Sequence, residues 1–174
     1  MTIKLISQLE SYAKEKKPFF MYYAPHQPHA PWKPHPRFKG TSKASVYGDV
    51  IQELDWSVGQ LLNELDRLEL SDNTLVIFSS DNGSALRFAT PNNPEWGMDR
   101  AVKLSELNAE NAHRTNGPNN MRGGKGDLIE GGHRVPFLVR WPGKIEPGSQ
   151  SEETISQTDM MATFAAILGM ELPT

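Results

Sequence analysis

The spacing of apolar residues along the chain predicts helices at both ends and in the middle. Apolar positions recur at intervals of three and four over 3–16 and, most clearly, over 46–68, which is the period of an amphipathic helix. A third helix is expected over 159–168, where an acidic first turn precedes the apolar residues and Gly169 provides a C-terminal stop. A weaker helix is expected over 99–112.

Three short apolar runs predict strands at 19–23, 75–78 and 137–141, and the first two are expected to be buried. The first two flank the long helix, and Ser71-Asp72-Asn73 provides the turn between that helix and the second run. A strand, a long helix and a second strand form a crossover unit, whose strands are parallel and whose connection is right-handed. The pattern therefore predicts one α/β domain with a mostly parallel sheet flanked by helices.

Composition excludes several classes of function. The chain has 174 residues, a net charge of −3 and no cysteine. An acidic chain does not favour general nucleic-acid binding, and no apolar run reaches the roughly 18 residues of a membrane span. Disulfides, thiolate metal sites and cysteine nucleophiles are absent as well, although the compartment stays open because secreted proteins need no disulfides.

The Asp81-Asn82-Gly83 sequence directly follows the second apolar run. Ligands collect at the carboxyl ends of strands in parallel α/β sheets, and a carboxylate beside an amide oxygen suits Ca²⁺ or Mg²⁺. The same three residues are also common turn formers, and Asn82-Gly83-Ser84 is a glycosylation sequon. A metal ligand cannot carry a glycan, so these two interpretations exclude each other.

The Asp81-Asn82 pair supplies fewer oxygens than Ca²⁺ requires. Two or three ligand atoms come from the pair, whereas the ion takes about 6–8. Further carboxylates that qualify by type are Asp49, Asp55, Asp127 and Glu130. None of them lies at an obvious strand end, so the remaining ligands are expected from elsewhere.

A proline-rich loop follows the first apolar run. Prolines recur every third residue at positions 25, 28, 31 and 34, which favours a polyproline II helix with three residues per turn. That geometry would place His26, His29, Trp32 and His35 on one edge, where imidazoles can act as acids, anion contacts or metal ligands. The alternatives are a rigid surface loop with solvated histidines, a zinc site that lacks an evident partner, and a PxxP recognition ligand.

The Arg122–Asp127 segment has glycines on both sides of Lys125. Such glycines let the backbone and the ammonium approach an anion closely. The segment is not a phosphate-binding Walker loop, because position 119 is Asn and Gly126 follows the lysine, and a flexible basic turn is the simple alternative. A cation, histidines and this lysine together would suit a tetrahedral oxyanion such as sulfate or phosphate.

These residues resemble those of the sulfatase family, within the alkaline phosphatase superfamily. The resemblance extends from 19–24 through 155–159 and is most specific at 79–83 and at 123–126 followed by 130–136. It implies that Asp81 and Asn82 bind Ca²⁺, with Mg²⁺ as an alternative, and that Lys125 contacts the sulfate. It also implies that His29 contacts the sulfate and the leaving-group oxygen as a general-acid candidate, with His26 near the same site.

The chain departs from this family in lacking its nucleophile. Members carry a Cys-x-Pro-Ser-Arg-type motif whose Cys or Ser becomes formylglycine, and an upstream pair of acidic metal ligands; neither is recognisable here. We therefore expect residues 1–174 to be the downstream part of a sulfatase catalytic domain, inactive alone. Exposed sheet edges would favour self-association.

The expected substrate is a sulfated small molecule or glycan, with no nucleic-acid or membrane partner. A phosphomonoester or phosphonate hydrolase of the same superfamily, and a non-catalytic anion- and metal-binding protein, are the alternatives. The family is commonly periplasmic, secreted or lysosomal, which does not fix the compartment.

Overall fold

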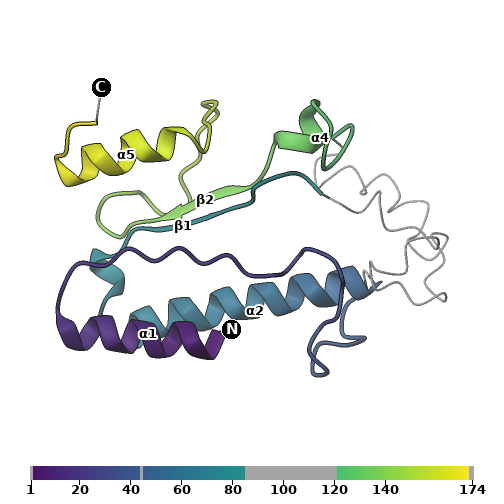
Figure 1. Cartoon of the computed structure of the whole chain (residues 1–174), viewed down its shortest axis with the longest axis horizontal. Helices are drawn as coiled ribbons and strands as arrows, with labels where there is room; N and C mark the ends of the chain where they lie inside the picture. The colour runs from purple at the N-terminus through teal and green to yellow at the C-terminus, as the bar shows by residue number, and fades with distance from the viewer. Residues whose placement is uncertain (1, 44, 85–120, 173–174) are drawn as a thin grey trace.

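The computed structural model describes residues 2–43, 45–84 and 121–172, and they form three layers (Figure 1). Helices α1 (Thr2–Glu15) and α2 (Ser45–Arg67) form one outer layer. A two-stranded sheet and an extended segment lie in the middle, and α5 (Asp159–Leu168) lies on the opposite side of the sheet. Within the described residues, no helix is long and apolar enough to cross a bilayer.

The helical predictions are confirmed to within a residue or two. Both long helices begin and end close to their expected positions, and α5 ends at Gly169, which has a φ of 63°. The expected turn at Ser71-Asp72-Asn73 is a short 3-10 helix, η1 (Ser71–Asn73). A four-residue helix, α4 (Glu130–His133), was not predicted, and the helix predicted over 99–112 lies outside the described residues.

The sheet consists of β1 (Val76–Ser79) and β2 (Phe137–Arg140), at the positions of the second and third predicted strands. They pair antiparallel, with Val76 opposite Arg140 and Ser79 opposite Phe137. The parallel pairing that the crossover argument predicted is therefore not formed among the described residues. The crossover argument joined 19–23 to β1, but β1 pairs instead with β2, which runs the opposite way.

The first predicted strand, 19–23, is an extended segment without strand pairing. It is not buried on both faces either, because Phe20 and Tyr22 are 71% and 83% exposed. One face packs on the helical layer, where the Phe19 ring stacks on Tyr12 with centroids 5.0 Å apart. The other face meets α5, where Phe20 and Phe164 form an edge-to-face pair. The prediction of a buried strand was wrong because an apolar run shows burial tendency but not backbone pairing.

The two long helices pack against each other and are joined by two polar links. Leu9 of α1 and Leu65 of α2 are buried. The Thr2 and Ser57 hydroxyl oxygens lie 3.2 Å apart, and Arg67 donates to a Glu10 carboxylate oxygen at 2.8 Å. This pairing gives α2 a fixed support, which matters because α2 also holds the loop that carries the histidines.

The second apolar cluster lies where the proline-rich loop meets α2. Ala30, Trp32 and Val50 are buried together, and Val46 and Tyr47 pack against them. The indole of Trp32 contributes a hydrogen bond as well as area, since its Nε1–H donates to the Pro28 carbonyl at 2.9 Å. The first turns of α2 therefore position the loop that contains His29.

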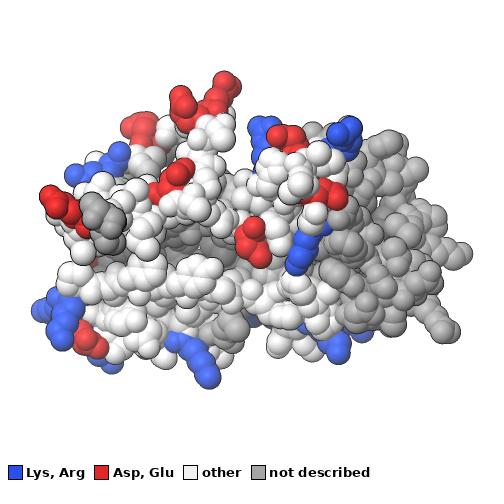
Figure 2. Space-filling model, turned by 45° about the horizontal axis from the view of Figure 1, so that its top comes forward, with Lys and Arg blue, Asp and Glu red and all other residues white. Residues whose placement is uncertain are grey.

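The surface shows charges of both signs around a mostly uncharged band (Figure 2). Large apolar side chains are exposed on the extended segment, on β2 and on α5, including Phe20, Tyr22, Leu138, Met161 and Leu168. Exposed apolar groups of this size favour association. The predicted self-association stays a prediction.

Replacing Val50 by Ala should destabilise the chain by about 1–2 kcal/mol, because the side chain is 2% exposed and its methyl groups would leave a void. The neighbouring substitution Ile51→Ala is the matched control, since Ile51 is 37% exposed. Urea denaturation followed by circular dichroism measures both. An equal loss at the two positions would show that the Trp32–Val50 cluster is not a core.

Candidate functional site

The candidate metal ligands lie in the turn that follows β1. Asp81 is exposed and Asn82 is half-buried. The Ser80 hydroxyl donates to the Asn82 carbonyl at 3.0 Å, and the Asn82 Nδ2 donates to the Gly83 carbonyl at 3.1 Å. Because Nδ2 is held by the backbone, Oδ1 is the atom through which Asn82 can bind a cation. A glycan at the same asparagine would take one of the two Nδ2 hydrogens, since it attaches through the amide nitrogen.

The glycine-rich segment lies directly against this turn. The Gly83 N–H donates to the Gly132 carbonyl at 2.9 Å, and the Lys125 N–H donates to the Ser84 carbonyl at 2.8 Å. These two bonds join residues that are more than 40 positions apart in the chain. The structure therefore brings together two of the three groups that the sequence singled out, namely the Asp81-Asn82 turn and the Lys125 loop.

The contact between the two loops leaves no room for a side chain. A Cβ at Gly83 would lie 1.8 Å from the Gly131 carbonyl oxygen of the facing segment, and within that segment one at Gly132 would lie 2.0 Å from the Asp127 carbonyl oxygen. Asp127 also shapes the lysine turn, because its carboxylate accepts the Gly124 N–H at 3.0 Å and its own N–H donates to the Gly124 carbonyl at 2.9 Å. The glycines thus serve the close approach of two backbones.

The proline-rich loop folds into turns, so the predicted polyproline II helix is wrong. The His29 N–H donates to the His26 carbonyl at 2.9 Å, whereas polyproline II has no internal hydrogen bonds. The predicted common edge fails as well, because Trp32 is 3% exposed while His26, His29 and His35 are exposed. The apolar indole of Trp32 is buried in the core while the polar imidazoles on either side stay exposed, and the turns of the loop make this possible.

His26 and His29 nevertheless stay together. Their rings lie with centroids 6.1 Å apart in an edge-to-face arrangement. The His29 Nδ1 lies 2.7 Å from the Ala30 carbonyl oxygen; because a carbonyl only accepts, Nδ1 carries the hydrogen. In the neutral ring Nε2 is then the unprotonated nitrogen, and it is the position from which a protonated His29 would give up its proton.

Tyr47 of α2 connects the histidine loop to the glycine loop. Its ring packs on Trp32 with centroids 5.0 Å apart, and its hydroxyl is hydrogen-bonded to the Ser84 side chain. Burial raises the pKa of Tyr47 above its ordinary value, and the Ser84 bond opposes that rise. The Ser84 carbonyl also accepts the Lys125 N–H. A continuous path of contacts therefore runs from the histidine loop to the glycine loop that contains Lys125.

The residues after β1 fit the chemistry of a hard cation but supply only part of its shell. Among the described residues, no three His, Asp or Glu side chains gather into a metal site. Asp49 is unsuited to that role, because both carboxylate oxygens accept backbone N–H groups, from Gly40 and Ser42. Asp127 is bonded within its turn, and Glu130 forms an exposed ion pair with Arg134 at 3.1 Å. Of the candidate ligands, Asp81 and Asn82 fit best.

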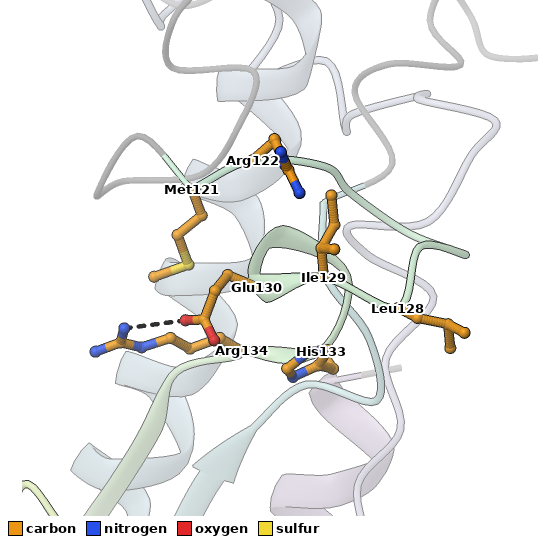
Figure 3. A pocket seen from close by; sticks show the side chains of 7 residues that line it. All are labelled: Met121, Arg122, Leu128, Ile129, Glu130, His133 and Arg134. Carbon is orange, nitrogen blue, oxygen red and sulfur yellow. Dashed lines mark hydrogen bonds and ion pairs between the residues drawn. The ribbon is translucent and has the colours of Figure 1, made fainter.

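A cavity of about 460 Å³ lies beside α4 (Figure 3). Its described lining residues are Met121, Arg122, Leu128, Ile129, Glu130, His133 and Arg134. Of the residues singled out from the sequence, Glu130 lines it, whereas Asp81, Asn82, Lys125 and the histidines of the proline-rich loop do not. The contacts that join the Asp81 turn to Lys125 are therefore a better guide to the site than this cavity.

Two contacts at the site were not foreseen. The Gln157 side chain donates to the Ser80 carbonyl, which fixes the segment before α5 against the Asp81 turn. The second is the hydrogen bond between the Tyr47 hydroxyl and Ser84. Gln157 lies in a segment that carries the family resemblance, whereas the local pattern gives no indication that Tyr47 reaches Ser84.

Comparison with known proteins decides the family. The sulfatase family model matches residues 1–170. The chain belongs to the sulfatase family. It is 41% identical to an N-acetylgalactosamine-6-O-sulfatase of Bacteroides thetaiotaomicron over 91% of the chain, and 37% identical to the steryl-sulfatase of Rattus norvegicus over its whole length. These alignments cover 28% and 27% of the two relatives.

The fold matches solved structures in the same way. A Bacteroides thetaiotaomicron protein, BT33336S-sulf, described in connection with the metabolism of multiple glycosaminoglycans, superposes with a TM-score of 0.80 at 38% identity. The match covers 99% of this chain and 32% of that one. It confirms the α/β fold class of the sulfatases and shows that this sulfatase chain corresponds to about a third of such a protein.

Replacing Gly83 by Ala should destabilise the chain by about 1–3 kcal/mol, because the added methyl group would push the two loops apart. Gly59→Ala is the control, since nothing lies within 4 Å of its Cβ position and alanine favours the α2 helix. Denaturation midpoints and amide exchange at Gly83 and Lys125 measure the effect. Unchanged exchange in Gly83→Ala would contradict the proposed loop contact.

Tyr47 should make the folded chain less stable above about pH 10. Its pKa is raised in the folded state, so the unfolded chain loses the proton first as the pH rises. The stabilisation is fully present below the unfolded pKa and is lost as the pH approaches the folded pKa. Denaturation midpoints across this range should fall more for the wild type than for Tyr47→Phe, and ultraviolet titration should assign the late tyrosinate step. Equal slopes would contradict the burial of this hydroxyl.

Proposed function

We propose that this chain forms the metal- and sulfate-contacting part of a sulfate ester hydrolase. The observation that supports this most directly is the hydrogen-bonded contact between the Asp81-Asn82 turn and the Lys125 loop in a member of the sulfatase family. A cation and an ammonium on adjoining loops provide positive charge where a sulfate group must be held. Such fixed charges stabilise the negative charge of the transition state.

In this proposal Asp81 and Asn82 bind Ca²⁺, with Mg²⁺ as the alternative, through carboxylate and amide oxygens. The bound cation would supply charge stabilisation to the sulfate oxygens. The remaining ligands are proposed to come from elsewhere in the protein, because two side chains provide at most three of the about 6–8 oxygens. Lys125 contributes one more positive charge from a turn whose backbone is fixed by Ser84 and Asp127.

His29 is proposed to give a proton to the leaving-group oxygen, and His26 to contact the substrate beside it. The Nδ1 hydrogen bond to the Ala30 carbonyl orients the imidazole, so that Nε2 is the proton-donating atom. The Trp32 anchor holds the turn that carries both histidines. A rigid loop of this kind keeps an acid in one orientation without help from the substrate.

The nucleophile is proposed to lie outside these 174 residues. Sulfatases use a formylglycine formed from the Cys or Ser of a Cys-x-Pro-Ser-Arg-type motif, and the chain contains no such motif and no cysteine. The relatives are named for amino-sugar and steryl sulfates, and the higher identity is to the sugar sulfatase. We therefore propose a sulfated sugar, free or within a glycan, as the substrate.

Substituting this chain for the matching part of the Bacteroides thetaiotaomicron sulfatase should yield an enzyme that retains sulfate ester hydrolysis. Within that chimera, Lys125→Ala should lower kcat by about 10²–10³, and His29→Ala by about 10²–10⁴. Lys144→Ala, an exposed lysine in the loop after β2, is the control and should retain activity. The isolated chain should hydrolyse no aryl sulfate.

Two results would contradict the proposal. One is a folded chimera in which Lys125→Ala and Lys144→Ala are equally active. The other is turnover of an aryl sulfate by the isolated chain, which would place the nucleophile within it. Hydrolysis of phosphate esters in preference to sulfate esters by the chimera would favour the phosphomonoesterase alternative.

A further inference from the structure

The loop at 33–43, which follows the histidine turn, is the most strongly basic segment of an otherwise acidic chain. It holds four of the 18 Lys and Arg residues and none of the 21 Asp and Glu residues, in a protein of net charge −3. The four cationic side chains are all exposed: Lys33, Arg37, Lys39 and Lys43. None of them takes part in the ion pairs of the described residues, which involve Lys17, Arg67, Arg134 and Arg140.

This basic loop is fixed in place by its backbone. The carboxylate of Asp49, 3% exposed, accepts the N–H groups of Gly40 and Ser42, both at 2.8 Å. Glu53 accepts the His35 N–H, also at 2.8 Å. Both carboxylates are thus bonded to backbone groups of the loop, and neither forms an ion pair with a loop cation.

One face of α2 makes all of these contacts. Asp49, Glu53 and two further residues, Gln52 and Trp56, follow the spacing that places side chains on one side of a helix. Gln52 is hydrogen-bonded to the Thr41 hydroxyl, and Trp56 packs against Phe38 with ring centroids 6.1 Å apart. Much of a helix face is therefore used to hold a polar, cationic loop rather than to bury apolar area.

Arg37 is the most constrained of the four cations. Its guanidinium carbon lies 3.5 Å from the centroid of the Trp56 ring and 4.5 Å from that of Phe38. Stacking on aromatic rings holds a guanidinium in one plane while its N–H groups stay directed to the side. A planar set of donors held in this way matches the oxygens of a sulfate or carboxylate group.

We propose that the basic loop 33–43 is a docking surface for a sulfated polysaccharide chain, separate from the residues proposed to act on the scissile ester. It would hold the polymer through anionic groups other than the one that is hydrolysed. The proposal rests on the proposed function only for the choice of polymer, and the loop begins four residues after His29 along the chain. Binding to this surface needs neither the nucleophile nor the cation.

A polysaccharide fits this surface better than a nucleic acid. Proteins that bind single-stranded nucleic acids combine positive charge with aromatic rings on which bases stack. Here the aromatic pair, Phe38 and Trp56, is already stacked with Arg37.

Binding of fluorescent dextran sulfate to the intact chain tests the proposal, with uncharged dextran and a single-stranded DNA of equal charge as comparisons. Replacing the four loop cations by Gln should weaken binding by about tenfold or more, the sum of several exposed charge contacts. The matched control removes four exposed lysines elsewhere: Lys4, Lys14, Lys17 and Lys144. It should weaken binding less than about threefold. Arg37→Lys keeps the charge but loses the planar donors, and should weaken binding two- to threefold.

The same assay separates this proposal from the proposed function. Dextran sulfate binding by the isolated chain requires no turnover, so a failed hydrolysis assay in the chimera leaves this proposal standing. Protection of the lysines from acylation by the bound polymer should be greater at Lys33, Lys39 and Lys43 than at the control lysines, a measurement that requires no variant to fold. Equal losses in the loop and control variants, equal protection of both lysine groups, no binding by the wild type, or DNA binding as tight as dextran sulfate would each overturn the proposal.

Discussion

The candidate site depends on the close contact of two backbones, at Gly83 and at Gly131-Gly132. The Gly83 N–H bonds to the Gly132 carbonyl, and a single Cβ at Gly83 would lie within 1.8 Å of a neighbouring oxygen. Because both partners are backbone atoms, the distance between the loops is set by the chain itself and not by long, flexible side chains. A lysine and a candidate cation site held in this way keep their relation before any substrate arrives, which is what electrostatic stabilisation requires.

Helix α2 transmits this constraint to the rest of the chain. Tyr47 joins Trp32 of the histidine loop to Ser84 of the metal-ligand turn. Farther along the helix, Arg67 binds Glu10 of α1, and Asp66 binds Arg140 of β2 at 3.0 Å. The histidine loop, α1 and the sheet are therefore all attached to one rigid element, α2. A change that tilts α2 would alter the distance between His29 and Lys125 even though neither residue lies on it.

Local patterns predicted the helices well because a 3.6-residue period is a property of consecutive residues, and α1, α2 and α5 needed nothing else. The predictions of a strand at 19–23 and of a polyproline II helix were wrong because both depend on contacts with distant parts of the chain. Strand pairing depends on a partner far away in the chain, and the path of the proline loop depends on Trp32 finding the pocket beside Val50. The pairing of the Asp81 turn with Lys125 was suggested by residue chemistry and by family resemblance. The contacts of Tyr47 and Gln157 with that turn exist only in three dimensions.

The two faces of α2 also explain how one continuous stretch of chain can hold both the proposed catalytic histidines and the basic loop 33–43. The face with Tyr47 and Val50 buries Trp32 and so fixes the histidines, while the face with Asp49 and Glu53 binds the backbone of the basic loop. The first uses apolar area and the second uses hydrogen bonds, so each can change without the other. Different substitutions on α2 would then change the orientation of the histidines and the affinity for the polymer. The histidines are positioned by the apolar packing of Trp32 on α2, whereas the cations are positioned by hydrogen bonds between α2 carboxylates and the loop backbone.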